Sequence, residues 1–272
     1  MTVSFHKMHG LGNDFVIIDT RKSKISLAED KICALADRYT GIGFDQLILL
    51  VAPENKDVDV SMRIYNCDGS PSGACGNATR CVARLLLDNS GHDQCRIETS
   101  AGVLTATGTD GIYTVNLGRP KLTWKDIPLD HDVDTLALDI HAGPLVNPCA
   151  VSLGNPHAVF FVPDVGAVDL ETYGPQIENN PIFPEKTNVE VVHIVDEKTL
   201  RMRVWERGCG ITSACGSGAG AAVVAAHRRD FIGRQAMVEL DGGVLTFNWD
   251  IDSGDLYMVG PAEHVYTGTV AL

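Results

Sequence analysis

A long internal repeat constrains the fold of this chain more than any other feature. The segment Met62–Ala83 (MRIYNCDGSPSGACGNATRCVA) returns as Met202–Val223 (MRVWERGCGITSACGSGAGAAV), 140 residues later and without a gap. In each copy a short run of alternating apolar residues indicates a strand, a loop with Gly and Ser follows, and Ala-Cys-Gly precedes an Ala-rich run typical of a helix. We therefore expect Cys75 and Cys215 at the N-termini of two equivalent helices.

Further pieces recur in the same order, at offsets of 140 to 144 residues. Gly12–Ile17 is answered by Gly154–Val159, each a Gly-Asn turn that leads into an apolar strand. Gln46 is answered by Asn188, so each half has a side-chain amide at a strand start. A fixed period across most of a chain is the signature of duplication and fusion.

The repeat predicts an α+β fold of two homologous halves, each a barrel-like antiparallel or mixed sheet wrapped around a central helix, with the active site in the cleft between them. The central helices are expected over Ala78–Asp88 and Gly218–Arg229, which are apolar on most faces and therefore enclosed. We expect an N-terminal repeat over 1–119 and a C-terminal repeat over 120–262, with 263–272 returning as a strand to the first. Ser26 and Glu29 have the spacing of a capping box at the start of another helix.

Composition excludes several classes of function. The net charge of -13 leaves no basic stripe for nucleic acid, and no apolar run is long enough for a membrane span. The eight cysteines include no C-x-x-C pair, and the H-x-x-H of His6 and His9 stands alone, so we expect no metal. The N-terminal segment lacks the features of a signal peptide, which favours a cytoplasmic protein with reduced thiols.

Two equivalent cysteines at helix N-termini suggest acid–base chemistry. The first backbone N–H groups of a helix carry partial positive charge, and such a position favours a thiolate over the free thiol, whose pKa is about 8.5. If the halves face each other, Cys75 and Cys215 approach one substrate from opposite sides, as inversion of a carbon centre requires. A thiolate and a thiol then act as base and acid and exchange roles with direction.

A carbanion that forms at the α-carbon of an amino acid needs stabilisation, and no sequence motif indicates a cofactor. The N–H groups of Gly76, Asn77, Gly216 and Ser217 are expected to hold the α-carboxylate. Glu206 and Arg207 supply a carboxylate and a guanidinium for an ammonium and a carboxylate.

At this point the chain resembles the cofactor-independent diaminopimelate epimerases over essentially its whole length. The motifs that carry the resemblance are Lys7–Phe15 (KMHGLGNDF), Ala74–Asn77 (ACGN), Arg80-Cys81, Gly154–Val159 (GNPHAV), Thr187–Glu190 (TNVE), Val204–Gly208 (VWERG) and Ala214–Gly216 (ACG). The resemblance implies that Cys75 and Cys215 interconvert LL- and meso-diaminopimelate without a cofactor, in lysine and peptidoglycan precursor biosynthesis. It implies that His157 and Glu206 tune the cysteine pKa values.

The resemblance also implies substrate-binding positions and a partner. The binding positions fall on Asn13, Gln46, Asn66, Gly76, Asn77, Asn155, Asn188, Glu206, Arg207, Gly216 and Ser217. A homodimer is implied, with Tyr266 at the contact. The chain departs from the usual family motifs at Ala78, Thr79, Ile211, Ser213 and Ser217, none of which is a reacting group.

Three alternatives stay open. Gly216-x-Gly218-x-x-Ala221 fits a loose dinucleotide fingerprint, but ten residues separate it from the preceding strand, where a tight turn is needed. A related racemase or isomerase on the same scaffold would act on proline, histidine or a phenazine precursor. A non-catalytic, redox-sensing protein would use the two cysteines as a reversible disulfide.

Overall fold

The computed structural model describes residues 2–23, 25–73, 75–88, 90–100 and 102–272, and the chain forms two compact units. Unit 1 comprises Met1–Val115 and Gly260–Leu272, and unit 2 comprises Asn116–Val259. The last strand of the chain therefore belongs with the N-terminal part. Ala74, the first residue of the first Ala-Cys-Gly, lies outside the described residues.

Unit 1 contains a mixed sheet and two helices. Its sheet runs in the order β19–β1–β2–β3–β4–β6–β7, with β5 beside β4 and with parallel pairs at β2/β3 and β4/β6. The elements are β1 (Thr2–Gly10), β2 (Asn13–Asp19), α1 (Glu29–Ala36), β3 (Gln46–Val51), β4 (Val60–Asn66), β5 (Pro71–Ser72), α2 (Gly76–Leu87), β6 (Gln94–Thr99), β7 (Gly102–Thr109), β8 (Ile112–Asn116) and β19 (Glu263–Ala271).

Unit 2 repeats this plan. Its sheet runs β11–β12–β13–β14–β16–β17–β18, with β15 beside β14 and with parallel pairs at β12/β13 and β14/β16. The elements are β9 (His141–Ala142), β10 (Leu145–Val146), β11 (Cys149–Ser152), β12 (Pro156–Phe161), α3 (Leu170–Glu178), β13 (Asn188–Asp196), β14 (Thr199–Glu206), β15 (Gly210–Thr212), α4 (Gly216–Arg228), β16 (Gln235–Leu240), β17 (Gly243–Trp249) and β18 (Leu256–Pro261), whose last two residues belong to unit 1. From β1 to β7 and from β11 to β17 the paired strands follow the same succession of antiparallel and parallel pairs, which confirms the predicted α+β fold of two homologous halves.

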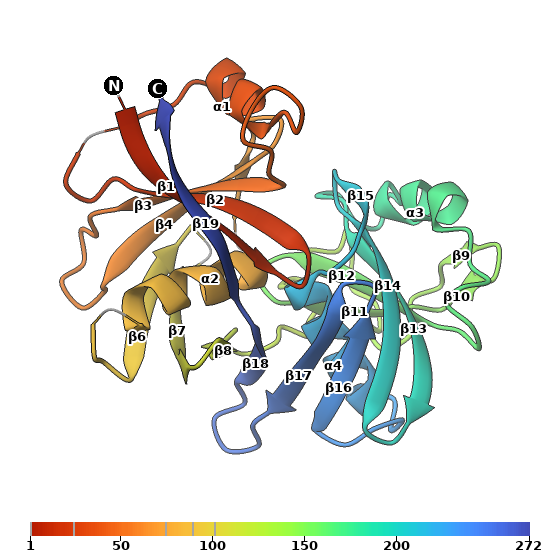
Figure 1. Cartoon of the computed structure of the whole chain (residues 1–272). Coiled ribbons are helices and arrows are strands. Elements are labelled where there is room, and N and C mark those ends of the chain that lie inside the picture. The colour runs from red at the N-terminus through yellow and green to blue at the C-terminus, as the bar shows by residue number, and fades with distance from the viewer. Residues whose placement is uncertain (1, 24, 74, 89, 101) are drawn as a thin grey trace. The chain divides into compact units, whose positions relative to one another are not determined.

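Each unit has one helix with strands packed around it. Figure 1 shows α2 against the strands of unit 1 and α4 among those of unit 2; α2 contacts β1, β2, β6 and β7, and α4 contacts β11 to β14, β16 and β17. In α4 every residue from Gly218 to Ala226 is buried. Side chains as small as Ala and Gly let strands approach the helix on all sides. Both helices begin two residues before their predicted starts, directly after the cysteines.

The predicted capping box of Ser26 and Glu29 is wrong. Helix α1 begins at Glu29, and its N-cap is Ala28, which makes no side-chain cap hydrogen bond. A capping box needs the glutamate at the third helical position, whereas here the glutamate is the first. Glu29 and Asp30 instead place negative charge in the first turn, where the helix dipole favours it.

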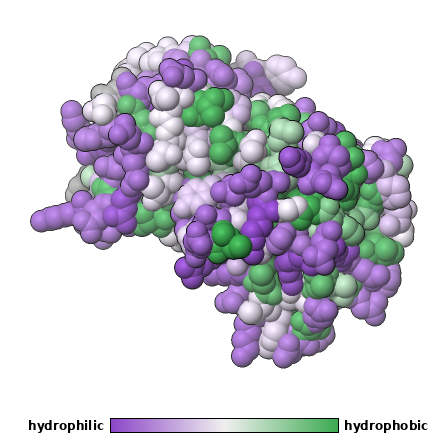
Figure 2. Space-filling view, turned by 90° about the horizontal axis from the view of Figure 1, so that it is seen from below, coloured by the Kyte–Doolittle hydropathy of each residue, from purple (hydrophilic) through white to green (hydrophobic). Residues whose placement is uncertain are grey.

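The exposed surface is largely polar. Figure 2 shows one face, on which hydrophobic residues stand in small groups among hydrophilic ones. Among the described residues, none of the helices has the length and apolar character needed to cross a membrane.

Two buried thiols predict that the fold weakens at alkaline pH. Burial raises the pKa of Cys81 in α2 and of Cys95 in β6 to about 12 each. An unfolded thiol ionises near pH 8.5, so the stabilisation is complete below that pH and is lost as the pH rises toward 12. At pH 10 we expect a loss of about 2 kcal/mol for each thiol. Urea unfolding at pH 7.5 and 10 measures it.

The matched control for this prediction is Cys33, which is exposed. Replacing Cys81 and Cys95 together by alanine should flatten the pH dependence of the unfolding free energy, although it lowers stability at pH 7.5. Cys33→Ala should leave the dependence unchanged. Equal pH dependence in all three proteins would contradict the assignment.

Candidate active site

Cys75 caps the N-terminus of α2, as the sequence predicts. Its backbone is extended, with φ -148° and ψ 109°, and its Sγ accepts a hydrogen bond from the N–H of Ala78 at 3.5 Å. The hydroxyl of Thr79 donates to the Cys75 carbonyl at 2.9 Å. The sulfur therefore lies at the first turn of α2, where it accepts from the N–H of Ala78, and Cys75 is half-buried.

The Cys75 sulfur contacts one end of a series of polar side chains in unit 1. Cys75 Sγ lies 3.8 Å from Asn13 Oδ1, and Asn77 Nδ2 donates to the same oxygen at 3.2 Å. Arg80 donates to Asn77 Oδ1 at 2.9 Å and to the carbonyl of Pro261 at 3.0 Å. The Arg80 side chain is fully buried, and burial lowers its pKa to about 10, while the charges of Cys81 and Cys75 act in the opposite direction. The structure thus brings together the predicted residues Cys75, Asn13 and Asn77.

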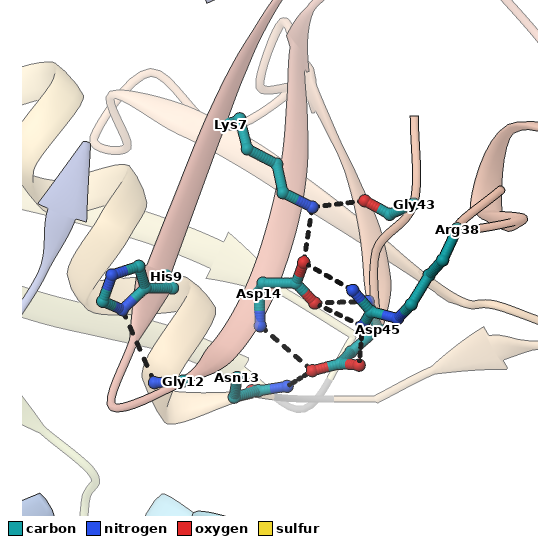
Figure 3. Close-up of polar contacts among 8 residues, drawn as sticks. All are labelled: Lys7, His9, Gly12, Asn13, Asp14, Arg38, Gly43 and Asp45. Atoms are coloured by element: carbon teal, nitrogen blue, oxygen red, sulfur yellow. Dashed lines mark hydrogen bonds and ion pairs between the residues drawn. The ribbon is translucent and has the colours of Figure 1, made fainter. Parts of the chain in front are cut away.

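A network of ion pairs supports Asn13 from the other side (Figure 3). Asn13 donates to Asp45 Oδ2 at 2.9 Å, and Arg38 bridges Asp45 and Asp14 at 2.6 and 2.8 Å. Lys7 donates to Asp14 and to the carbonyl of Gly43. Burial alone would raise the pKa of Asp14, but hydrogen bonds from Arg38 and Lys7 outweigh it and lower that pKa. Asp14 is therefore a carboxylate at neutral pH.

Gln46 and Asn66 are neighbours across β3 and β4. Gln46 Nε2 donates to Asn66 Oδ1 at 3.0 Å, and Asn66 Nδ2 donates to Ser70 Oγ at 3.1 Å. Gln46 Oε1 is buried and has no hydrogen-bond partner within the part of the chain that the structure describes. A buried acceptor without a partner is costly, so this oxygen is available for a donor on a ligand.

Cys215 occupies the equivalent place at the start of α4, but its surroundings differ. The residue is buried, and Sγ lies 3.6 Å from Ser217 Oγ. Burial raises the pKa of the Cys215 thiol well above its usual range, and Glu206 and Glu190 raise it further; the N–H of Gly218 and the Ser217 hydroxyl oppose them. The expectation that the helix N-terminus makes this thiol more acidic is wrong, because desolvation and two carboxylates outweigh the dipole.

A buried contact between a histidine and a glutamate lies near Cys215 in unit 2. His157 and Glu190 are fully buried, and Nδ1 lies 2.7 Å from Glu190 Oε1. His157 Nε2 lies 3.0 Å from Asn155 Oδ1, and Asn155 donates to Ser217 Oγ at 3.3 Å. The two ring nitrogens of His157 thus contact oxygen atoms of two different side chains. The predicted residues Asn155, His157 and Ser217 are thereby joined in one chain of contacts.

Glu206, at the end of β14, is half-buried. Burial raises the pKa of Glu206, and hydrogen bonds with Thr212 and Cys215 counteract part of this. The next residue, Arg207, donates its backbone N–H to Asn188 Oδ1 at 3.0 Å and its guanidinium to the Glu185 carbonyl at 2.9 Å. Asn188 donates to the Pro156 carbonyl at 2.9 Å and is buried. Asn188 thus fixes the backbone between Glu206 and Arg207. The predicted residues Gly76 and Gly216 are the first residues of α2 and α4.

Sequence reasoning missed Glu190 and Asp45 as parts of the site. Glu190 Oε2 is buried and has no hydrogen-bond partner among the described residues. A Cβ built at Gly218 would lie 2.6 Å from Glu190 Oε1, so only glycine leaves room for this carboxylate under the first turn of α4. The signal in the sequence was a charged residue inside the apolar strand Val189–Val192. Asp45 directly precedes the amide of Gln46 and gave no separate signal.

Among the described residues, no three or more His, Cys, Asp or Glu side chains form a group that could hold a metal ion.

Comparison with known proteins decides the family. The family model described as diaminopimelate epimerase matches residues 5–123 and 149–265, which lie in both halves of the repeat. The chain belongs to the diaminopimelate epimerase family. The diaminopimelate epimerase of Rhodospirillum centenum is 50% identical over 272 residues, which cover 100% of this chain and 93% of that protein. That of Acidiphilium cryptum is 48% identical over 265 residues, covering 97% and 95%.

Solved structures of more distant proteins share the fold. A hydroxyproline epimerase from Agrobacterium vitis matches with a TM-score of 0.72 and 14% identity over 100% of this chain and 93% of its own. A phenazine biosynthesis protein of the PhzF family from Bacillus anthracis matches with a TM-score of 0.68 and 18% identity over 100% of both chains. These matches extend the two-half architecture beyond diaminopimelate epimerases.

Proposed function

We propose that this protein is a diaminopimelate epimerase that interconverts LL- and meso-2,6-diaminopimelate without a cofactor, and that it serves lysine and peptidoglycan precursor synthesis. The observation that carries the proposal is the identity of about one half to named diaminopimelate epimerases over the whole chain. The two cysteines agree with it, since each is the N-cap residue of the equivalent helix in its own half of the repeat.

The proposed reaction is a proton transfer by two bases. One cysteine thiolate takes the α-proton, and the other cysteine, as a thiol, delivers its proton to the opposite face of the same carbon. The carbon is inverted, and the two sulfurs have exchanged protonation states, so the reverse reaction uses them in opposite roles. The raised pKa of Cys215 supports a neutral thiol there in the free enzyme. Cys75 is then the base in the direction that begins from this state.

The proposed substrate contacts use the remaining site residues. Backbone N–H groups of the first turns, at Gly76, Asn77, Gly216 and Ser217, hold the α-carboxylate and stabilise charge that develops on it. The other proposed binding residues are Asn13, Gln46, Asn66, Asn155, Asn188, Glu206 and Arg207. The orphan oxygen of Gln46 supports an ammonium contact, because an –NH₃⁺ group only donates hydrogen bonds. His157 and Glu206 are proposed to adjust the acidity of the cysteines.

The proposal includes a cytoplasmic homodimer. None of the eight cysteines, all of which lie among the described residues, is in a disulfide, which agrees with a reducing compartment. Tyr266 on β19 is 43% exposed, its ring packs edge-on against Phe5 at 5.9 Å between centroids, and its neighbour Val265 is 54% exposed. An aromatic and an aliphatic side chain on an exposed strand suit a protein contact. Sedimentation of the wild type and of Tyr266→Glu tests it, and a wild-type monomer would contradict it.

The deciding experiment follows the α-hydrogen. Wild-type enzyme is incubated in deuterated water, under reducing conditions, with LL- and meso-diaminopimelate and separately with proline and histidine. We expect deuterium incorporation and epimerisation with diaminopimelate alone. Preference for proline or histidine would instead identify the protein as a related racemase. No deuterium exchange at the α-carbon of any of these amino acids would favour the redox-sensing alternative.

A further inference from the structure

A chain of side-chain amides in unit 1 runs between two opposite charges. Asp45 Oδ2 accepts from Asn13 Nδ2 at 2.9 Å, Asn13 Oδ1 accepts from Asn77 Nδ2 at 3.2 Å, and Asn77 Oδ1 accepts from Arg80 at 2.9 Å. At one end of the chain the Asp45 carboxylate accepts from the –NH₂ of Asn13, and at the other end the Arg80 guanidinium donates to the oxygen of Asn77. Both amide dipoles therefore point the same way.

The charges at the two ends fix this direction. Oxygen and nitrogen of an Asn amide are distinguished by their hydrogen-bond partners. If the Asn13 amide turned over, its oxygen would face the Asp45 carboxylate and its –NH₂ would face the –NH₂ of Asn77. Both contacts would then be repulsive, whereas in the observed orientation both are hydrogen bonds. Because charge-assisted hydrogen bonds are about twice as strong as neutral ones, the two ends dominate the choice.

The carboxylate of Asp45 is itself held in place (Figure 3). Arg38 donates to its Oδ1 at 2.6 Å, and the backbone N–H of Asp14 donates to its Oδ2 at 3.0 Å. The backbone N–H of Asp45 donates in return to Asp14 Oδ1 at 3.0 Å. At the other end the fully buried side chain of Arg80 is fixed by the Pro261 carbonyl. Neither end of the chain is free to turn.

Cys75 contacts the middle of this chain. Its sulfur lies 3.8 Å from Asn13 Oδ1, within reach of an S–H donor. We propose that Asp45 is a positioning residue of the reaction, which fixes the amide of Asn13 so that its oxygen, and not its –NH₂, faces the thiol of Cys75. The inference rests on the proposed function for its catalytic meaning. In the reverse direction Cys75 is the acid, and an acceptor oxygen stabilises its thiol and not its thiolate, so the chain limits how readily Cys75 gives up its proton.

The test measures the rate at which iodoacetamide modifies Cys75 as a function of pH, read by mass spectrometry of the peptide that contains it. In Asp45→Ala the Asn13 amide loses its carboxylate partner and no longer holds its oxygen on the sulfur. The thiol then ionises more readily, and below the midpoint of the profile we expect alkylation of Cys75 to be about fivefold faster than in wild type. The exposed thiol of Cys33, in the same digest, should keep its profile.

Asp45→Asn separates orientation from charge. Its side-chain oxygen can still accept from Asn13, so we expect the Cys75 profile to lie within about twofold of wild type and epimerase kcat/KM to recover relative to Asp45→Ala. If Asp45→Asn moved the profile as far as Asp45→Ala, loss of charge alone would explain the shift and the inference would be overturned. Arg21→Ala, which breaks the half-exposed ion pair with Asp19 on β2, is the control and should change nothing.

A further variant guards against a misfolded protein. Arg38 is 55% exposed, so Arg38→Ala is expected to fold, and it removes the cation that holds Asp45. We expect a shift of the Cys75 profile in the same direction as in Asp45→Ala, by about twofold. An unchanged profile in both variants overturns the inference even if wild type epimerises diaminopimelate. A wild type that exchanges no α-hydrogen would instead remove the proposed function, and the alkylation profiles would still test the amide orientation.

Discussion

Replacing either Cys75 or Cys215 by alanine is expected to reduce epimerisation of diaminopimelate at least about a thousandfold, because each turnover needs both a base and an acid. The single variants should differ in deuterium exchange. With one base left, each variant removes the α-proton from one isomer only and returns a deuteron to the same face. Proton NMR of LL- and meso-diaminopimelate in deuterated water measures both quantities in one experiment.

The control for the cysteine variants is Cys33→Ala, which removes an exposed thiol from α1 of unit 1. It should turn over substrate at the wild-type rate. If either Cys75→Ala or Cys215→Ala retained substantial epimerisation, the two-base scheme would be wrong. Deuterium exchange into both isomers without epimerisation would also contradict the scheme, because one remaining base is expected to act on one face of the carbon only.

The repeat made the architecture predictable. Gly-Asn turns, strand alternation and the Ala-rich runs after Cys75 and Cys215 are local signals, and each was present twice at a nearly constant offset. Each copy therefore gave independent evidence for the same strand–loop–helix pattern. The predicted starts of the two helices differ from the observed ones by only two residues. The failure at Ser26 came from the opposite situation. A capping box is a pattern of two residues, and nothing in the sequence specified that α1 begins at Glu29.

The acidity of the thiols could not be predicted in the same way. The helix dipole is a property of position in the sequence, but desolvation depends on what packs around the residue. Cys215 is enclosed by unit 2 and lies near Glu190 and Glu206, so its pKa rises although it caps a helix. Glu190 itself looks like an ordinary polar residue of a strand until its fully buried contact with His157 is seen.

The two halves have diverged in charge at repeat-related positions. Arg80 of unit 1 corresponds to Gly220 of unit 2 at the offset of 140, and Glu190 corresponds to Ile48 at the offset of 142. Unit 1 therefore has a buried cation near its cysteine, and unit 2 has a buried anion near its own. Opposite charges favour opposite protonation states, and a base and an acid that start from a defined arrangement need such a difference.

Glu190→Gln is expected to make the Cys215 thiol more acidic, because it removes one of the two carboxylates that raise its pKa and leaves burial unchanged. At pH 8 we expect alkylation of Cys215 to be about tenfold faster. We also expect kcat for epimerisation to fall at least about tenfold, since Cys215 is then less often the neutral thiol that must act as the acid while Cys75 acts as the base. Peptide mass spectrometry and the epimerase assay measure the two effects on the same samples.

Two further variants separate charge from structure at this position. Gln at position 190 can still accept from His157 Nδ1, so the fold should be kept, whereas Glu190→Ala leaves the buried ring without its partner and should lower the unfolding free energy by about 3 kcal/mol. Glu239→Gln removes the same charge from an exposed position on β16 of unit 2 and should leave Cys215 unaffected. If Glu190→Gln left the alkylation profile of Cys215 at its wild-type position, the carboxylate would have no part in keeping that thiol protonated, and the charge difference between the halves would not set the starting state of the reaction.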